Sequence, residues 1–404
     1  MKTFNTLNSI CLITLGMSLP LYTQAANQDW TDTVNAANGQ TVYWNAWGGA
    51  DNINGYIQWV ADQVEAKYNI DLEHVKLTDT ADAVNRVLAE KTAGKSSDGS
   101  IDLIWINGEN FRAMKDNGLL YGPFANDLPN YKAYVNPEAR QSLTQDFGTA
   151  VDGMESPWGM AQVIFMYDTA QLSQPPKSMG QLLAYAKAHP GRISYPEPPQ
   201  FLGSTFLKQA LHELTPHKAA LLQPVNTIDF DKVTQPLWDY LDQLHDVAWR
   251  SGEVFPSSAE EMMRLLDDGE IDVALSFDVS AATVQIDQGN LPETVRSYVF
   301  THGTIGNTHF VAIPYNSGAT EGAQVVANFL LSPEAQAYKQ NPTVWGDLSV
   351  LDYNKLSNDQ QQLFDQLPSG IATLSIEELG TTLPEPHSSW MEALEKEWRS
   401  RYAN

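Results

Sequence analysis

Short apolar runs alternate with amphipathic stretches along most of the chain, which is the pattern of an α/β architecture. Residues 41–46 (TVYWNA) predict a strand, and the turn Trp47-Gly48-Gly49 follows it. Apolar residues then recur with helical spacing and place one helix face at Ile53, Tyr56, Ile57, Val60 and Val64.

A second unit repeats this order. It has a helix at 79–91, a buried strand at 101–106 and the polar turn Asn107-Gly108-Glu109-Asn110. Ligands of open α/β sheets collect beyond the carboxyl ends of strands, so both turns are candidates for a site. The alternation continues through further predicted strands at 161–167, 191–195, 271–277 and 306–314. Further helices are predicted at 179–188, after residues 201–205 towards 212 with Ser204 or Thr205 as the N-cap, at 259–266, at 321–331 and from 333.

Length and charge narrow the class of protein. The 404 residues suggest two or three domains at about 150 residues each. Acidic residues outnumber basic ones 49 to 24, which gives a formal net charge of −25. Nucleic acid and anionic membrane surfaces are therefore not expected as partners, because both are bound through clustered Lys and Arg.

The first 25 residues predict a secretory signal peptide. Lys2 provides a positive start, residues 10–19 form a short apolar run, and Thr23-Gln24-Ala25 predicts cleavage after Ala25. The only cysteine, Cys11, lies inside this run, too early for a lipid anchor. The mature chain would therefore be periplasmic, without disulfides or thiolate chemistry.

Several motifs resemble one family. The segments AIPYNSG at 312–318 and ANFLLSPEAQ at 327–336 resemble the closing signature of extracellular solute-binding proteins of ABC importers, of the family 1 type. The segments VYWNAWGG at 42–49, DLIWINGENF at 102–111 and ESPWG at 155–159 are similar to the YnjB-like branch of these proteins.

The resemblance implies a fold and a role for the chain. It implies an α/β fold of the type II periplasmic-binding-protein class, with two lobes, each a mixed sheet flanked by helices, joined by crossing strands. Lobe 1 would hold residues 27–150 and 280–335, and lobe 2 residues 151–279 and 336–404. A small solute would bind between the lobes, favour their closure by its differential contacts, and pass to permease subunits in the inner membrane. The protein would act as a monomer, without catalytic residues, cofactor or metal.

Four groups of residues are the candidates for ligand contact. The two turns supply Trp47, Gly48, Gly49, Asn107, Glu109 and Asn110, and the first crossing between lobes, where family members often touch ligand, supplies Trp158 and Gln162. The second lobe would contribute Tyr195, Ser204, Thr205, Phe277 and Asp278, with Trp345, Gly346 and Asp347 as a weaker group. Each also has a structural interpretation, since glycines make turns, Ser, Thr and Asp cap helices, and Trp158 could pack between lobes.

The candidate turns favour a positively charged ligand. They hold Asp51, Glu109, Asp278 and aromatic residues but few basic ones, which suits a cation or an amphipathic molecule such as an amine or a thiamine-like ring. A phosphate or carboxylate at a helix amino end, or a sugar on tryptophans, stays open. The alternative function is a secreted hydrolase such as a glycosidase with a carboxylate pair. A zinc helix is not favoured, because His212 and His217 are one residue too far apart and Pro216 separates them.

Overall fold

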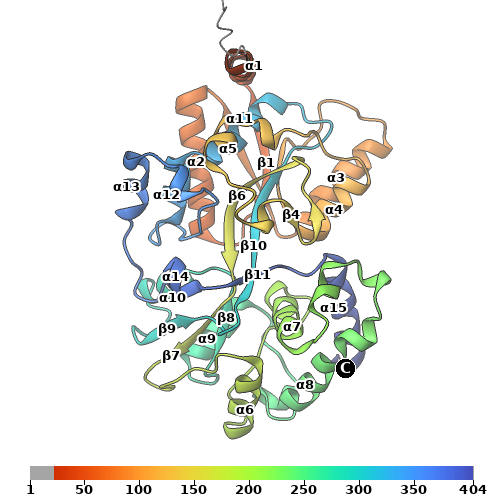
Figure 1. Cartoon of the computed structure of the whole chain (residues 1–404), viewed down its shortest axis with the longest axis vertical. Helices are drawn as coiled ribbons and strands as arrows, with labels where there is room; N and C mark the ends of the chain where they lie inside the picture. Colours follow the sequence, from red (N-terminus) through yellow and green to blue (C-terminus); the bar gives the residue numbers. More distant parts are fainter. Residues whose placement is uncertain (1–21, 404) are drawn as a thin grey trace, which may run out of the picture.

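Two α/β bodies make up the computed structural model, which describes residues 22–403 (Figure 1). The larger sheet, in the upper lobe, has the strand order β11-β10-β3-β1-β2, and a further strand, β6, pairs with β10. Its strands are β1 (Thr41–Trp47), β2 (Asp71–Leu77), β3 (Leu103–Ile106), β6 (Glu155–Gln162), β10 (Thr304–Ala312) and β11 (Thr382–Leu383). Strand β1 runs parallel to β2 and β3, whereas β10 runs antiparallel to β3 and β6.

The lower lobe is built on a smaller sheet, β8-β7-β9. Its strands are β7 (Ile164–Asp168), β8 (Ala274–Ser276) and β9 (Val295–Tyr298). The helices that pack around it are α6 (Met179–Ala188), α7 (Phe201–Leu214), α8 (Phe230–His245), α9 (Ala259–Asp267), α10 (Ala281–Asp287) and α15 (Ser389–Tyr402).

Helices of the upper lobe follow the predicted pattern closely. They are α1 (Tyr22–Ala37), α2 (Asp51–Tyr68), α3 (Thr80–Thr92), α4 (Gly108–Asp116), α5 (Pro129–Tyr134), α11 (Thr320–Leu330) and α12 (Pro333–Gln340). The buried face of α2 consists of the five apolar residues whose spacing predicted it. Two further helices, α13 (Asn358–Asp365) and α14 (Ile376–Leu379), lie in the segment that returns to the lower lobe.

Two long strand paths connect the lobes. Strand β6 pairs with β10 in the upper lobe, and after Val163 the chain continues as β7 in the lower one. On the other path, β9 leads through a short turn into β10 (Figure 1). The fold predicted from the sequence, two mixed α/β lobes joined by crossing strands, is confirmed.

Each lobe has its own hydrophobic core. Trp238, Trp390 and Trp398 are buried in the lower one, and Trp44 and Trp158 in the upper one. Trp345 packs with the upper core and Val295 with the lower one. The residue boundaries of the lobes given above stay a prediction.

Two details of the sequence-based description need correction. Residues 191–195 form only an isolated bridge, Ile193 to Val273, rather than a strand, because the proline-rich segment that follows leaves the sheet. The strand predicted over 161–167 is split between β6 and β7.

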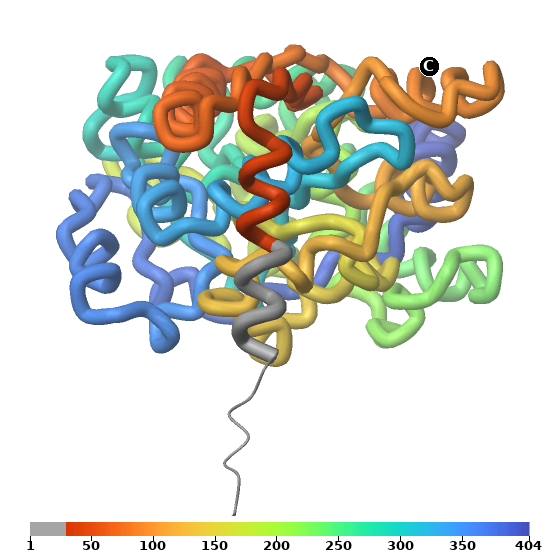
Figure 2. Tube along the Cα trace, turned by 90° about the horizontal axis from the view of Figure 1, so that it is seen from above, coloured from red at the N-terminus to blue at the C-terminus, as the bar shows by residue number. Residues whose placement is uncertain are grey.

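The amino-terminal helix lies across the top of the upper lobe (Figure 2). Trp30 and Val34 pack against the upper core. Most of the predicted signal peptide lies outside the described residues, and cleavage after Ala25 stays a prediction. Among the described residues, none of the helices has the length and apolarity needed to cross a membrane.

Candidate functional site

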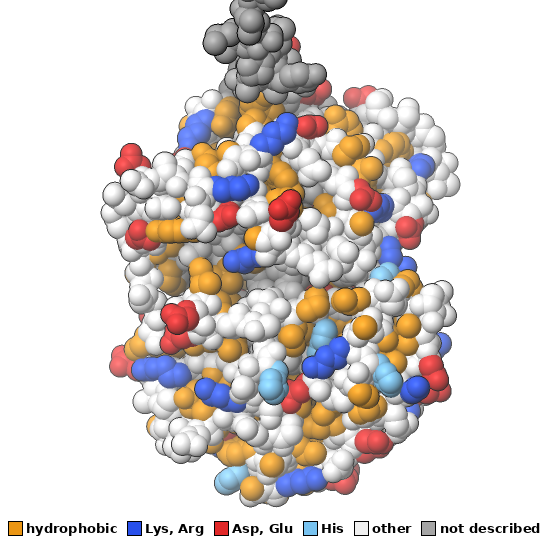
Figure 3. Space-filling model, in the orientation of Figure 1, with side chains coloured by type: hydrophobic (Ala, Val, Ile, Leu, Met, Phe, Trp, Pro, Cys, Tyr) orange, Lys and Arg blue, Asp and Glu red, His pale blue; other side chains and the backbone are white. Residues whose placement is uncertain are grey.

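The carboxyl ends of β1, β2 and β3 point toward the lower lobe. The strand register shows this. Ile106, the last residue of β3, pairs with Phe310, and the residues of β10 that precede Phe310 lie toward the lower lobe. The amino ends of α3 and α4 therefore face the lower lobe. The surface is indented at this level, between the two bodies (Figure 3).

A buried lysine lies where the lobes meet. Lys208 of α7 is 1% exposed, and its Nζ donates to Glu385 at 2.7 Å. Two aromatic rings flank the ammonium group, Phe147 at 4.9 Å and Phe201 at 5.5 Å from Nζ to the ring centroids. Lys208 thus has one direct carboxylate partner and two π faces.

Three more carboxyl groups lie in this region: Glu109 and Glu395 interact electrostatically with Lys208, and Asp146 interacts with Glu109 and Glu385. Burial raises the pKa of Glu109, at the amino end of α4, while Lys208 lowers it and the charge of Glu395 raises it. Burial also raises the pKa of Asp146 well above its usual range, although the Gly108 N–H donates to its carboxylate at 2.6 Å. Burial likewise raises the pKa of Glu385, against the effect of Lys208.

Glu395 of α15 is the fourth carboxyl group. It accepts a hydrogen bond from the Ser204 hydroxyl at 2.6 Å, and burial raises its pKa. Glu109, Asp146, Glu385 and Glu395, with Lys208, are here called the interlobe acidic cluster. Arg399 on the same helix as Glu395 lies 3.8 Å from its carboxylate, so the cluster has four acids, one buried lysine and one exposed arginine. Burial is the main cause of the raised pKa in all four acids, and the charge of Lys208 lowers the pKa of Glu109, Glu385 and Glu395 against it.

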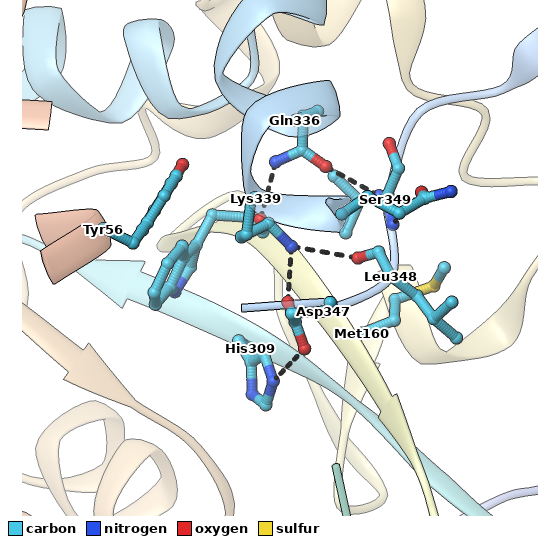
Figure 4. A network of polar contacts seen from close by, with 12 residues as sticks. Tyr56, Met160, His309, Gln336, Lys339, Asp347, Leu348 and Ser349 are labelled. Carbon is cyan, nitrogen blue, oxygen red and sulfur yellow. Dashed lines mark hydrogen bonds and ion pairs between the residues drawn. The ribbon is translucent and has the colours of Figure 1, made fainter. Parts of the chain in front are cut away.

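A second group of charged and aromatic residues lies on the upper side of the crossing strands (Figure 4). Lys339 of α12 is fully buried and forms an ion pair with Asp347, whose other oxygen bonds His309 Nε2 at 3.0 Å. Trp345 stacks on His309 with ring centroids 6.0 Å apart, and Trp105 contacts His309 edge to face at 5.2 Å.

Asp278 connects this second group to the lower lobe. Its carboxylate accepts from the Ser280 N–H at 2.9 Å, and the Ser280 hydroxyl donates to the Gly346 carbonyl at 3.3 Å. Burial, with a further contribution from the charge of Asp347, raises the pKa of Asp278 to about 7. The neighbouring Phe277 contacts the ring of Phe201 at 5.5 Å, which places it beside Lys208.

The structure brings several predicted ligand contacts together. Glu109 belongs to the interlobe acidic cluster, Ser204 donates to Glu395 within it, and Phe277 contacts Phe201 beside it, whereas Asp278 lies near Asp347 in the second group. Asn110 donates weakly to Glu109 at 3.5 Å, and Asn107 occupies the N-cap position of α4 without a side-chain cap bond.

The first turn lies at the end of β1. Trp47 is 39% exposed, and its ring lies against Gly49, where an added Cβ would be only 2.2 Å away. Gly48 is similarly crowded by Lys76. Both glycines are thus required by close packing, and whether this turn also contacts ligand stays a prediction.

Four other predicted contacts have structural partners. Trp158 is fully buried and contacts Trp44 and Tyr56, and Tyr195 is fully buried, with its hydroxyl 2.7 Å from His245 Nε2. Gln162 donates to Thr304 and to the Leu379 carbonyl, and Thr205 donates to the Phe201 carbonyl. Their contact with ligand also stays a prediction.

Sequence reasoning missed most of the acidic cluster. Lys208, Asp146, Glu385, Glu395 and Phe147 come from segments far apart in the chain. One signal was available, because Lys208 interrupts the apolar stretch of α7, where residues 202–212 are all buried. A lysine in such a stretch needs an acidic partner.

Comparison with known proteins defines the class. The family model described as bacterial extracellular solute-binding protein matches residues 59–352, so the chain belongs to this family. The chain is 45% identical over 386 residues to Protein YnjB of Escherichia coli strain K12, which covers 95% of this chain and 97% of the relative. The predicted resemblance is therefore confirmed, and the hydrolase alternative is not supported.

Solved structures of low sequence identity share the fold. A periplasmic thiamin binding protein has a TM-score of 0.59 at 20% identity, covering 90% of this chain and 95% of its own. The spermidine/putrescine ABC transporter substrate-binding protein PotD from Streptococcus pneumoniae has 0.58 at 16%, covering 89% and 99%. The periplasmic binding protein AfuA from Actinobacillus pleuropneumoniae, with fructose-6-phosphate bound, has 0.59 at 15%, covering 90% and 98%.

Proposed function

We propose that this solute-binding protein captures a small organic cation, an amine or a thiamine-like ring, between its lobes and delivers it unchanged to the permease subunits of an ABC importer. It acts in the periplasm as a monomer, after removal of residues 1–25. The ligand favours closure because it contacts both lobes at once only in the closed state.

The observation that carries this proposal is the charge of the interlobe acidic cluster. Four carboxyl groups from both lobes surround one lysine, which Glu385 already pairs. A bound cation would favour the ionised form of these carboxyl groups, and the rings of Phe147 and Phe201 offer it π faces. A bound anion would instead oppose their ionisation.

The fold neighbours alone do not decide the ligand. One is named for thiamin and one for spermidine and putrescine, but a third holds a sugar phosphate. The acidic residues of the site favour an organic cation, such as thiamin or a polyamine, over a sugar phosphate.

Calorimetric titration with thiamine, spermidine, putrescine and fructose 6-phosphate tests the proposal. We expect at least one of the cations to bind stoichiometrically and to be recovered unchanged, and the phosphate not to bind. The Glu395→Gln and Glu109→Gln variants should each weaken cation binding about tenfold or more, as expected for a charge-assisted contact.

Glu392→Gln is the matched control, because Glu392 is an exposed acid on the same helix as Glu395. It should leave the affinity within about twofold. Binding of the phosphate that tightens in Glu395→Gln would overturn the cationic ligand, and steady loss of a cation with formation of product would overturn the transport role.

A further inference from the structure

The hairpin of β4 (Gln145–Asp146) and β5 (Thr149–Ala150) has an unusual turn. Phe147 and Gly148 join the strands, both with positive φ, 43° and 76°. Two-residue hairpin turns often need positive φ, but Asn or Gly normally supplies it. A bulky residue in this conformation is costly and persists where its surroundings hold it in place.

The surroundings of Phe147 come from both lobes. Its side chain is 4% exposed. In the upper lobe the ring lies against Gly108, where an added Cβ would be 3.4 Å from it. In the lower lobe the ring faces Lys208 at 4.9 Å. The Phe147 ring therefore packs between the amino end of α4 and the middle of α7.

Backbone contacts tie the same turn to the lower lobe. The Ser388 N–H donates to the Phe147 carbonyl at 2.9 Å. A Cβ added to Gly148 would lie 3.1 Å from the His387 Cα, so the two backbones pass very close together. The pocket along this seam, lined in part by Phe147, Asn307 and Glu385, has a volume of about 30 Å³. That is room for water rather than an organic molecule, so the two lobes lie close together at this turn.

Asp146 ties the turn to the upper lobe. Its carboxylate accepts from the Gly108 N–H at 2.6 Å, at the start of α4. The next residue, Glu109, is a candidate ligand contact. The hairpin thus links the backbone that positions Glu109 to the segment that precedes α15, which carries Glu395.

We propose that residues 146–148 form an interlobe latch, in which Phe147 and Gly148 engage the lower lobe only when the lobes are closed and so set the balance between open and closed protein. Asp146 and Phe147 are then positioning residues for the solute site. The latch rests on the solute-binding role, but not on the charge of the solute.

Distance measurement between spin labels tests the latch without any ligand. The predicted mature chain has no cysteine, so Asn85→Cys on α3 and Lys232→Cys on α8, both exposed, place one label on each lobe. Pulsed electron resonance then gives the distribution of distances between the lobes. In the Phe147→Ala variant we expect a clear shift toward longer distances compared with the unsubstituted labelled protein.

A second variant acts on the other side of the turn. Gly148→Ala keeps the Phe147 ring but places a methyl group against the His387 backbone, so it should also move the distribution outward. Gln145→Ala is the matched control, because the Gln145 side chain is exposed on the same hairpin and accepts a hydrogen bond from Gln141, away from the lower lobe. It should leave the distances unchanged.

A merely structural role for the hairpin would lower the melting temperature of Phe147→Ala without moving the distances. Unchanged distance distributions in Phe147→Ala and Gly148→Ala, with folding verified by circular dichroism, would overturn the latch. Neither result depends on which solute binds. The distance measurement therefore tests the latch, and the titration tests the cationic ligand, independently of each other.

Discussion

Two lysines are fully buried among residues 22–403, and their surroundings differ in charge. Lys339 is paired with Asp347, which also bonds His309, and Leu348 contributes a carbonyl at 3.0 Å, so donors and acceptors are matched within one lobe (Figure 4). Lys208 lies between lobes, among four acids. The matched pair at Lys339 is accounted for by packing within one lobe, whereas the acids around Lys208 carry the proposal of a bound cation.

The largest effect expected from this comparison is on stability. Lys339→Met should lower the free energy of unfolding by about 3–5 kcal/mol, because it leaves Asp347 buried without its cation. Urea unfolding followed by circular dichroism measures the change. Combining it with Asp347→Asn should recover part of the loss. A loss below about 1 kcal/mol would show that the pair is not the matched structural unit described above.

Asp278, between the two groups, should make stability depend on pH. Its pKa is about 7 in the folded protein and about 4 when unfolded, so the folded state holds the proton more tightly. The stability that Asp278 gains from holding this proton is fully present below about pH 4 and is lost as the pH rises to about 7.

The Asp278→Asn variant should therefore be more stable than the wild type at pH 8, by about 1–2 kcal/mol because the side chain is partly exposed, and similar to it near pH 4. Urea unfolding at the two pH values gives both differences. Equal stability of the two proteins at pH 8 would contradict this assignment.

The smallest expected effect is a change in stability when Glu109, one of the acids near Lys208, loses its charge. Burial raises the pKa of Glu109, so its ionised form destabilises the ligand-free protein. Glu109→Gln should increase the free energy of unfolding at pH 8 by about 0.5–1 kcal/mol, although the same variant weakens cation binding. A decrease in the free energy of unfolding would mean that ionised Glu109 stabilises the lobe, and it would contradict a role for Glu109 in ligand binding.

Local periodicity was enough to predict much of the fold. The buried face of α2 and the strand before Asn107 follow from residue spacing, because each element buries one side against a neighbour in sequence. The missing strand at 191–195 shows the limit, since pairing depends on a distant partner, Val273.

The site could be predicted only in part. Glu109 was found because it follows a strand end, where ligands collect. Ser204 was found as a predicted N-cap, but that prediction was wrong, because α7 begins at Phe201 with Gln200 as its N-cap and Ser204 lies inside the helix. Glu385, Glu395 and Phe147 could not be found this way, because a turn, a loop and the last helix come together only in the folded chain.

Mass spectrometry of small molecules released from protein purified without denaturation tests the cationic site most directly. We predict an organic cation, present at close to one molecule per chain and at clearly lower stoichiometry in the Glu395→Gln variant. A sugar phosphate or another anion, released at the same stoichiometry from both proteins, would contradict the account.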